Sequence, residues 1–325
     1  MLFLVTGVAG FIGSYVASGL LSEGHEVLGI DNLNDYYDVD LKKARLERLR
    51  DRAGFQFEQI DISQPGAFTS LRRRDEIDRV IHLAAQAGVR YSLEKPFAYA
   101  ASNMTGHLAV LEFCRHAAKR PFLAYASSSS VYGDTTPVPF SEDHHVAKPV
   151  SLYAATKMAD ELMSEAYAKL YGLRQFGMRF FTVYGPWGRP DMAYWSFTEK
   201  ILKNEPIRVF NGGQMRRDFT FIDDAVRGVL SIALADSDVL ASKPLHRLYN
   251  IGHHQPVALL DFISEIETVS GVSAHKIMEP MQAGDVTETC ADITRMKTEF
   301  DYQPQTDLNA GLSVFVDWYR SYSKL

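Results

Sequence analysis

The sequence predicts an α/β fold, a Rossmann-type doubly wound parallel sheet with a smaller mixed α/β domain. Short apolar runs rich in β-branched and aromatic residues alternate with helix-like stretches, which is the pattern of a parallel sheet covered by helices on both faces. A glycine-rich turn directly follows the first of these runs, as in folds that bind dinucleotides.

The expected strands are the runs at 2–6, 26–30, 55–60, 79–83, 122–126 and 175–180. Between them, apolar side chains recur at helical spacing in two sets: Ile12, Val16 and Leu20, and Met104, Leu108 and Leu111. Each set forms one helix face, which we expect to pack on the sheet or on a partner.

After about residue 181 the pattern changes to segments punctuated by proline and glycine, such as 184–192 and 211–219, with shorter helices between them. We therefore expect a Rossmann domain over 1–181 and a second domain over 182–325. Two later segments, 218–234 and 247–252, are predicted to be a helix and a strand. Parts of 218–252 are accordingly expected to rejoin the first domain.

Composition and charge indicate an ordinary soluble globular protein. The chain has 325 residues, of which 46% are hydrophobic, and a formal net charge of -6. This balance gives no electrostatic case for binding nucleic acid or a membrane surface. No apolar run approaches the ~20 residues of a membrane span, and the chain opens on a strand rather than a charged leader. Cys114 and Cys290 are too few for a disulfide framework, so we expect buried thiols in the cytoplasm.

The turn at 5–13 reads VTGVAGFIG and places Gly7, Gly10 and Gly13 at three-residue intervals between a strand and a helix. Glycine lets the backbone approach a pyrophosphate, and the N-terminus of the following helix supplies free N–H donors and positive potential. The alternative is a plain glycine-rich turn, which the strand before it and the helix after it disfavour.

Asp31 closes the second strand at about the distance expected for a carboxylate that binds an adenosine ribose. Such a carboxylate accepts hydrogen bonds from the ribose hydroxyls and repels a 2'-phosphate, and no arginine adjoins it, so NAD is favoured over NADP. Asp61 and Ile62 end the third strand at the same sheet edge. Asp61 either contacts the adenine or caps the next turn.

Tyr153 and Lys157 lie four residues apart, on one face of a helix that begins after Pro149. Chance also produces this spacing, so its position carries the argument: it follows the strand that ends in the serines 127–130. In a dinucleotide-binding fold, a tyrosine there can exchange a proton with an alcohol while nicotinamide exchanges a hydride with the same carbon. The lysine ammonium and the positive nicotinamide ring both favour the phenolate, which makes Tyr153 the candidate general base.

Taken together, these segments resemble the extended short-chain dehydrogenases/reductases of the nucleotide-sugar epimerase group. The resemblance covers essentially the whole chain and rests on 5–13, 31–32, 61–62, 82–88, 126–133, Tyr153 with Lys157, and 178–192. Within the group, the chain is most similar to UDP-glucuronate 4-epimerases over 31–49, 87–96 and 180–193.

The resemblance implies that tightly held NAD oxidises C4 of UDP-glucuronate to a 4-keto sugar. The 4-keto sugar then rotates within the site, and its reduction on the other face gives UDP-galacturonate. It implies catalytic roles for Tyr153, Lys157 and Ser128, and a UDP-sugar-binding role for the domain at 182–325. The implied NAD-binding residues are Gly7, Gly10, Phe11, Ile12, Gly13, Asp31, Asn32, Asp61, Ile62, Leu83, Ala84, Ala85, Asn103, Tyr153 and Lys157.

The resemblance further implies how the substrate is held. Ser128 is expected to hydrogen-bond the sugar O4, and Ser127 to be structural. The remaining substrate-binding residues are Ser129, Ser130 and Thr182 at the C5 carboxylate, Arg189 over the sugar or against its acid, Phe210 at the uracil, and Arg217 at the diphosphate with Arg90 or Arg295 as helper. The alternative for Arg217 is a surface ion pair with Asp218.

Other activities are weighed by what the sequence lacks. Related decarboxylases carry an acidic residue beside the catalytic serine or threonine, and none lies between Ser127 and Tyr132. Epimerases of neutral hexoses usually have asparagine at Thr182 and arginine at Gln282. A UDP-glucose or UDP-N-acetylglucosamine 4-epimerase is therefore the first alternative, followed by a UDP-glucuronate decarboxylase and a non-catalytic NAD-binding protein.

We expect no metal, because the histidine pairs at 144–145 and 253–254 lack a carboxylate or cysteine at ligand spacing. Members of the family usually pair through helices that correspond to about 96–118 and 152–171, so the resemblance implies a homodimer.

Overall fold

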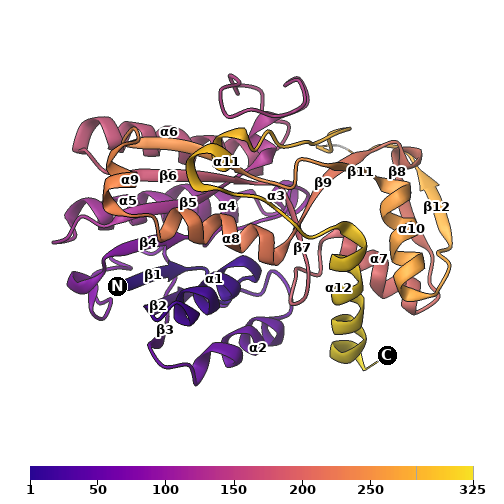
Figure 1. Ribbon diagram of the computed structural model, residues 1–325, viewed down its shortest axis with the longest axis horizontal. Helices are drawn as coiled ribbons and strands as arrows, with labels where there is room; N and C mark the ends of the chain where they lie inside the picture. Colours follow the sequence, from indigo (N-terminus) through magenta and orange to yellow (C-terminus); the bar gives the residue numbers. More distant parts are fainter. Residues whose placement is uncertain (283, 325) are drawn as a thin grey trace.

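The computed structural model describes residues 1–282 and 284–324, and the chain is organised around a sheet of seven parallel strands in the order β10-β6-β5-β4-β1-β2-β3 (Figure 1). The strands are β1 (Leu2–Thr6), β2 (Glu26–Asp31), β3 (Phe55–Gln59), β4 (Arg79–His82), β5 (Phe122–Ser128), β6 (Gln175–Phe180) and β10 (His246–Ile251). The strand order reverses between β1 and β4, so the predicted Rossmann-type, doubly wound sheet is confirmed.

The sheet is buried on both faces because its side chains alternate between two cores. In β1, Leu2 and Leu4 belong to one core, whereas Phe3 and Val5 belong to the other. This is why the strand is apolar from Leu2 to Val5 and shows no alternation of polar and apolar residues there.

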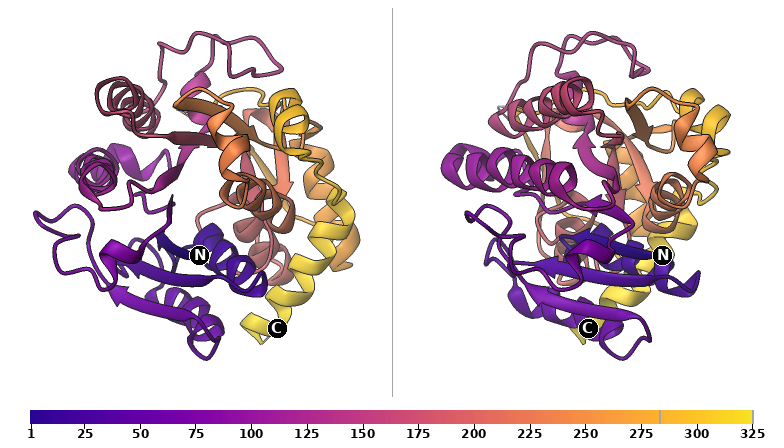
Figure 2. Two further views of the ribbon diagram at one scale, coloured as in Figure 1. Left: turned by 60° about the vertical axis from the view of Figure 1, so that its left-hand side comes forward. Right: turned by 90° about the vertical axis from the view of Figure 1, so that its left-hand side faces the viewer.

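Helices cover both faces (Figure 2). On one face, α1 (Phe11–Ser22) packs against α8 (Ile222–Ala233) and α2 (Val39–Arg50). On the other face, α5 (Gly106–His116) lies beside α6 (Leu152–Tyr171). The shorter helices around the sheet are η1 (Arg74–Glu76), α3 (Tyr91–Glu94), α4 (Pro96–Tyr99), η2 (Ala100–Thr105), η3 (Ser129–Tyr132), α9 (Ser237–Ala241) and α11 (Thr294–Phe300).

A smaller α/β region stands beside the carboxyl edge of the sheet, on the right of Figure 1. It holds a three-stranded sheet in the order β11-β9-β7 and a two-stranded sheet, β12-β8. Its elements are β7 (Thr182–Tyr184), α7 (Ala193–Leu202), β8 (Ile207–Phe210), η4 (Asn211–Gly213), β9 (Arg216–Phe221), β11 (Pro256–Ala258), α10 (Leu259–Ser270), β12 (Lys276–Glu279) and α12 (Leu308–Ser323). The exact division into two domains stays a prediction, since β10 returns to the large sheet.

The prediction of a helix over 218–234 is wrong for its first four residues. They belong to β9, and α8 begins only at Ile222. Phe219 and Phe221 are separated by one residue, which is strand periodicity. The ring of Phe219 stacks on Phe262 at a centroid distance of 4.0 Å, so packing against α10 favours the extended form.

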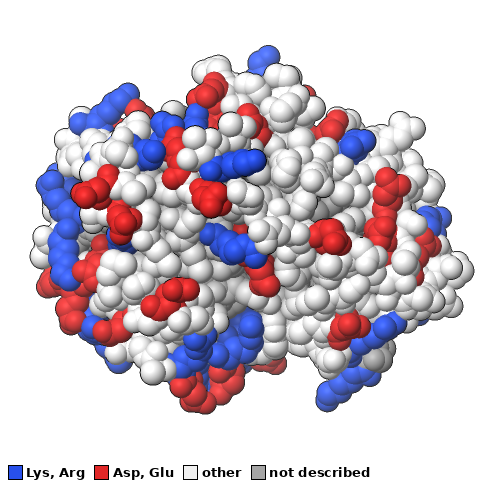
Figure 3. All heavy atoms as spheres, viewed as in Figure 1, with Lys and Arg blue, Asp and Glu red and all other residues white. Residues whose placement is uncertain are grey.

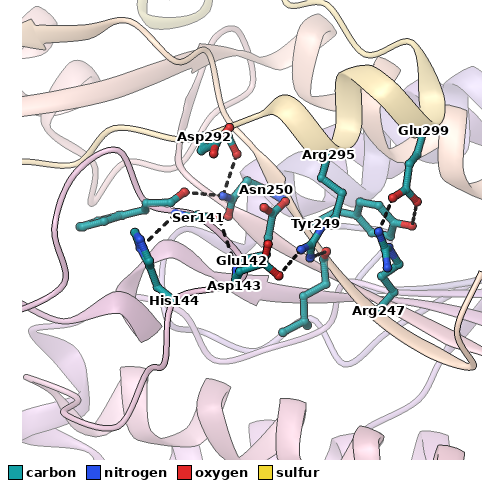
Figure 4. Close-up of polar contacts among 12 residues, drawn as sticks. Ser141, Glu142, Asp143, His144, Arg247, Tyr249, Asn250, Asp292, Arg295 and Glu299 are labelled. Carbon is teal, nitrogen blue, oxygen red and sulfur yellow. Dashed lines mark hydrogen bonds and ion pairs between the residues drawn. The ribbon is translucent and has the colours of Figure 1, made fainter.

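Asn250, near the end of β10, joins the large sheet to two distant segments (Figure 4). Its side-chain amide donates hydrogen bonds to the carbonyl oxygens of Phe140, at 2.7 Å, and Asp292, at 3.0 Å. Its backbone N–H donates to Glu142 at 2.8 Å. These bonds hold the segments around Phe140 and Asp292 beside β10.

The surface carries both signs of charge, interspersed over the face drawn in Figure 3. Within 1–282 and 284–324, none of the helices combines the length and the apolar character that crossing a bilayer requires. Of the two thiols that were expected to be buried, Cys114 is buried but Cys290 is partly exposed, and both are free.

Candidate active site

A cavity of about 900 Å³ lies at the carboxyl ends of the parallel strands, between the large sheet and the smaller region. This is where a doubly wound sheet binds its ligand. The predicted site residues that line it are Gly7, Gly10, Phe11, Ile12, Gly13, Asp31, Asn32, Asp61, Ile62, Leu83, Ala84, Ala85, Arg90, Ser128, Ser129, Ser130, Tyr153, Lys157, Thr182, Arg189, Phe210 and Arg217.

Two predicted residues lie outside the cavity wall. Asn103 is buried behind it, where its amide donates to the carbonyl of Gln86 at 3.1 Å and its oxygen accepts the Gln86 N–H at 2.8 Å. Asn103 therefore fixes a residue that lines the cavity, and direct contact of Asn103 with the cofactor stays a prediction. Arg295 forms an ion pair with Asp143 at 2.5 Å, away from the cavity (Figure 4).

The glycine-rich turn forms a cradle at one end of the cavity. Gly7 has a φ of +72°, and a Cβ there would lie 2.7 Å from the Ala84 nitrogen. A Cβ on Gly13 would collide with the Gly7 carbonyl oxygen. Side chains at these positions would force β1 and α1 apart, so the glycines keep the N-terminus of α1 open to a phosphate group.

Asp31 ends β2 beside this cradle. Its carboxylate accepts hydrogen bonds from the backbone N–H groups of Ala9, at 3.1 Å, and Leu33, at 2.9 Å. Burial raises its pKa. Asp61 accepts the Ser63 N–H at 2.9 Å and also lines the cavity, so its capping role and the predicted contact with adenine are compatible.

The candidate base is held by a well-capped helix. The Ser151 hydroxyl accepts the Ala154 N–H at 3.1 Å and starts α6, which places Tyr153 and Lys157 in its first turns. Lys157 donates to the Ala126 carbonyl at 2.9 Å and to Asp160 at 3.0 Å. Burial raises the pKa of Asp160 to about 6, against the lowering effect of Lys157.

The hydroxyl groups of the serines at 127–130 point in different directions. Ser127 donates to Glu161 at 2.5 Å, inside the protein, which agrees with its expected structural role. The Ser128 hydroxyl faces the cavity, donates to the Ser130 hydroxyl at 3.1 Å and accepts the Ser130 N–H at 3.2 Å. Ser129 also lines the cavity. Ser128, Ser129 and Ser130 therefore line the cavity together with Tyr153, where β5 ends and η3 begins.

Arg189 closes the same part of the cavity from the other side. Its guanidinium pairs with both oxygens of Asp191, at 3.0 and 2.5 Å, and its backbone N–H donates to the Tyr194 hydroxyl at 2.9 Å. Arg189 and Tyr153 line the same cavity. If an acidic ligand binds beside Arg189, its carboxylate and that of Asp191 share the Arg189 guanidinium.

The far end of the cavity combines an aromatic ring with arginines. The guanidinium carbons of Arg90 and Arg208 lie 5.1 and 5.2 Å from the ring centre of Phe210. Arg217 donates to the carbonyl oxygens of Val286 at 2.6 Å and Thr287 at 3.2 Å, among others, and does not pair with Asp218. The alternative of a surface ion pair is thus not realised, and Arg217 keeps its charge for an anion.

Sequence reasoning missed two side chains that reach the site, one from the loop between β2 and α2 and one from α2. Tyr36 lines the cavity, and Arg45 is completely buried behind it. A signal for Arg45 was available, because it stands at i+4 from Leu41 and i−4 from Leu49, on the apolar stripe of α2. An arginine in that position must find internal hydrogen-bond acceptors.

A glycine cradle, a ribose carboxylate and a Ser, Tyr and Lys set at the switch point of a parallel sheet define a dinucleotide-dependent enzyme of the Rossmann class. The chain belongs to the NAD dependent epimerase/dehydratase family, whose model matches residues 3–252. The predicted family and its dependence on NAD are confirmed.

Individual relatives agree with this assignment. The chain is 49% identical to the uncharacterized 37.6 kDa protein in the cld 5' region of Escherichia coli O111:H-, over 100% of both chains. It is 45% identical to UDP-glucuronate 4-epimerase 2 of Arabidopsis thaliana, over 99% of this chain and 76% of that one. The structure of UDP-glucuronic acid 4-epimerase from Bacillus cereus with UDP-glucuronic acid and NAD is 34% identical, with a TM-score of 0.89, over 99% of this chain and 100% of that one.

Proposed function

We propose that the protein is an NAD-dependent UDP-glucuronate 4-epimerase, which interconverts UDP-glucuronate and UDP-galacturonate. The observation that carries the proposal is a group of hydroxyls and a cation that line the same cavity as the candidate base: Ser129, Ser130, Thr182 and Arg189. Hydrogen-bond donors and a guanidinium suit a sugar carboxylate. The relatives with this activity in their names support the same assignment.

The cofactor residues fit NAD because the Asp31 carboxylate lies beside the glycine cradle, where it accepts the Ala9 N–H at 3.1 Å, and both line the same cavity. When bound, NAD supplies the hydride acceptor and donor for C4 of the sugar. Tyr153 removes the proton of the C4 hydroxyl during oxidation and returns a proton during reduction. Lys157 stabilises the phenolate, and Ser128 orients the C4 oxygen.

The carboxylate contacts have a chemical purpose. Oxidation at C4 creates a β-keto acid, which loses carbon dioxide when the bond from C5 to the carboxyl carbon aligns with the carbonyl π system. Donors that hold the carboxyl group away from that alignment preserve the six-carbon sugar. The run from Ser127 to Tyr132 also lacks an acidic residue that would assist elimination or decarboxylation.

The first test is a product assay with purified protein and UDP-glucuronate. We expect UDP-galacturonate, resolved by chromatography against both standards. The matched control is Tyr153→Phe, which should lower the rate by roughly 10²–10⁴-fold while NAD still copurifies, as judged by mass spectrometry of the released nucleotide. Exclusive formation of UDP-xylose would contradict the proposal, as would brisk epimerisation of UDP-glucose without turnover of UDP-glucuronate.

We further propose that the protein is a cytoplasmic homodimer that pairs through the face formed by α4, η2, α5 and α6. Phe97 is 87% exposed, and Leu162 and Leu170 on α6 are each 70% exposed. Met104 and Leu108, expected to pack on the sheet or a partner, are 40% and 39% exposed, which favours a partner. The free thiols of both cysteines agree with a reducing compartment.

A further inference from the structure

The segment that follows β2 crosses the cavity and contacts the turn at 186–191, which is distant in sequence. Tyr36 Oη donates a hydrogen bond to Asp191 Oδ2 at 3.0 Å, across 155 residues. Asp191 is the carboxylate that holds Arg189. Tyr36 therefore reaches Asp191 from the loop that follows Asp31, the candidate ribose-binding carboxylate at the end of β2.

The surroundings of Tyr36 are shaped for this contact. Its ring lies against that of Tyr91, with centroids 4.6 Å apart. A Cβ on Gly88 would overlap the Tyr36 hydroxyl, and Gly88 has a φ of +95°. The loop at 86–91 thus leaves space for the Tyr36 hydroxyl at Gly88 and packs against the Tyr36 ring through Tyr91.

Arg45 makes the second connection, from α2. Its guanidinium donates to the carbonyl oxygens of Trp187 at 2.8 Å and Gly188 at 2.6 Å, and to that of Ala9 at 3.1 Å. It also donates to the Tyr37 hydroxyl at 2.6 Å. Among the described residues, no carboxylate forms an ion pair with it. A buried guanidinium that serves only neutral oxygens acts as a fixed, branched cross-link.

These contacts join the two ends of the site. Ala9 belongs to the glycine-rich turn, and Trp187 and Gly188 directly precede Arg189. Arg45 therefore spans from the cofactor cradle to the backbone that carries the sugar-facing arginine, and Tyr36 holds the carboxylate that orients that arginine.

We propose that Tyr36 and Arg45 are positioning residues that hold the turn at 186–191 against the cofactor cradle, so that Arg189 is placed for an acidic sugar. The part of this inference that concerns the acidic sugar rests on the proposed function. The part that concerns the turn does not, because it follows from contacts within the chain.

The test uses Tyr36→Phe, which removes one hydroxyl and keeps the ring. The matched control is Tyr249→Phe, which also removes a hydroxyl bonded to a carboxylate, Glu299 at 2.9 Å, but lies outside the cavity (Figure 4). In the NAD-loaded protein without sugar, hydrogen exchange of the amides at 187–192 should become about tenfold faster in Tyr36→Phe and stay unchanged in the control. The KM for UDP-glucuronate should rise more than kcat falls.

Arg45→Lys is the second variant, because lysine keeps the charge but cannot span both sets of carbonyl groups. It should accelerate exchange over the same amides. If Arg45→Lys does not fold, Tyr36→Phe decides alone. Unchanged exchange at 187–192 in Tyr36→Phe would overturn the inference, even in an active epimerase. Faster exchange in a protein that does not turn over UDP-glucuronate would support the positioning role and refute the proposed function.

Discussion

At the scale of single residues, buried histidines make stability depend on pH. His82 is 2% exposed and hydrogen-bonds to Thr6 at 2.7 Å, and burial lowers its pKa to about 3. Burial also lowers the pKa of His107 and of His246. Below pH ~6.5 the His82 side chain binds a proton in the unfolded chain but stays neutral in the folded protein. The contribution of His82 to stability is therefore complete above that pH and is lost as the pH falls towards 3.

We predict that His82→Gln loses less stability on acidification than the parent protein. A histidine that stays neutral in the folded state contributes a loss of about 1.4 kcal/mol between pH 7.5 and 5.5. Urea unfolding at both pH values measures the difference. Asp160 has the opposite effect, because its pKa is raised and its contribution to stability is lost as the pH rises through about 6. Asp160 is present in both proteins, so its contribution cancels in the comparison. An equal pH dependence in the two proteins would contradict the prediction.

Residues that take part in the chemistry are easier to identify from the sequence than residues that position other side chains. Tyr153, Lys157 and Asp31 carry recognisable spacing, and all three line the cavity. Tyr36 and Arg45 escape notice because their partners in the turn at 186–191 lie 142 to 155 residues away. No local pattern records a contact over that separation.

At the scale of elements, a buried ion pair joins α6 to the strands below the serines. Arg179 on β6 donates to both oxygens of Glu161 at 2.8 and 2.7 Å, and Ser127 donates to the same carboxylate. Both charged side chains are buried. The pair thus fixes how the helix that carries Tyr153 and Lys157 sits over the end of β5.

We predict that Arg179→Met lowers the free energy of unfolding by about 3–5 kcal/mol, because it leaves the Glu161 carboxylate buried without its cation. The double variant Arg179→Met with Glu161→Met should recover most of this loss, since both charges are then gone. Chemical denaturation of the two variants and the parent measures the effect. A double variant no more stable than Arg179→Met would show that the loss comes from packing rather than from the unpaired charge.

Element boundaries are where sequence reasoning is weakest. Six of the seven strands of the large sheet follow from apolar runs, and each is found within two residues of its expected bounds. The predicted start of α8 is four residues too early, although Phe219 and Phe221 are separated by one residue, which is strand periodicity. Their packing and pairing in the smaller region agree with β9.

At the scale of the whole molecule, alternating strands and helices predict the parallel sheet, and the sheet then predicts the site. The carboxyl ends of β1, β4 and β5 meet at one edge, so the glycine cradle and the serines lie in one cavity. The closure of that cavity by the turn at 186–191 depends on the relative placement of two regions. That placement is not encoded in any local periodicity.

The assembly prediction belongs to this scale. The helices α5 and α6 lie side by side on the outer face of the sheet (Figure 2), and Leu162 and Leu170 recur on one face of α6 at i and i+8. If this face pairs with a second copy, Phe97→Asp should raise the dissociation constant of the dimer by roughly 100-fold, because it buries a carboxylate without a partner.

Sedimentation equilibrium of the parent and of Phe97→Asp measures this change. The matched control is Ile277→Asp, which places the same charge on β12 at a side chain that is 48% exposed but far from this face. We expect the control to remain dimeric, because β12 lies in the smaller region at the opposite side of the molecule (Figure 1). A parent protein that sediments as a monomer would refute the dimer, and dissociation by Ile277→Asp but not by Phe97→Asp would move the interface to the smaller region.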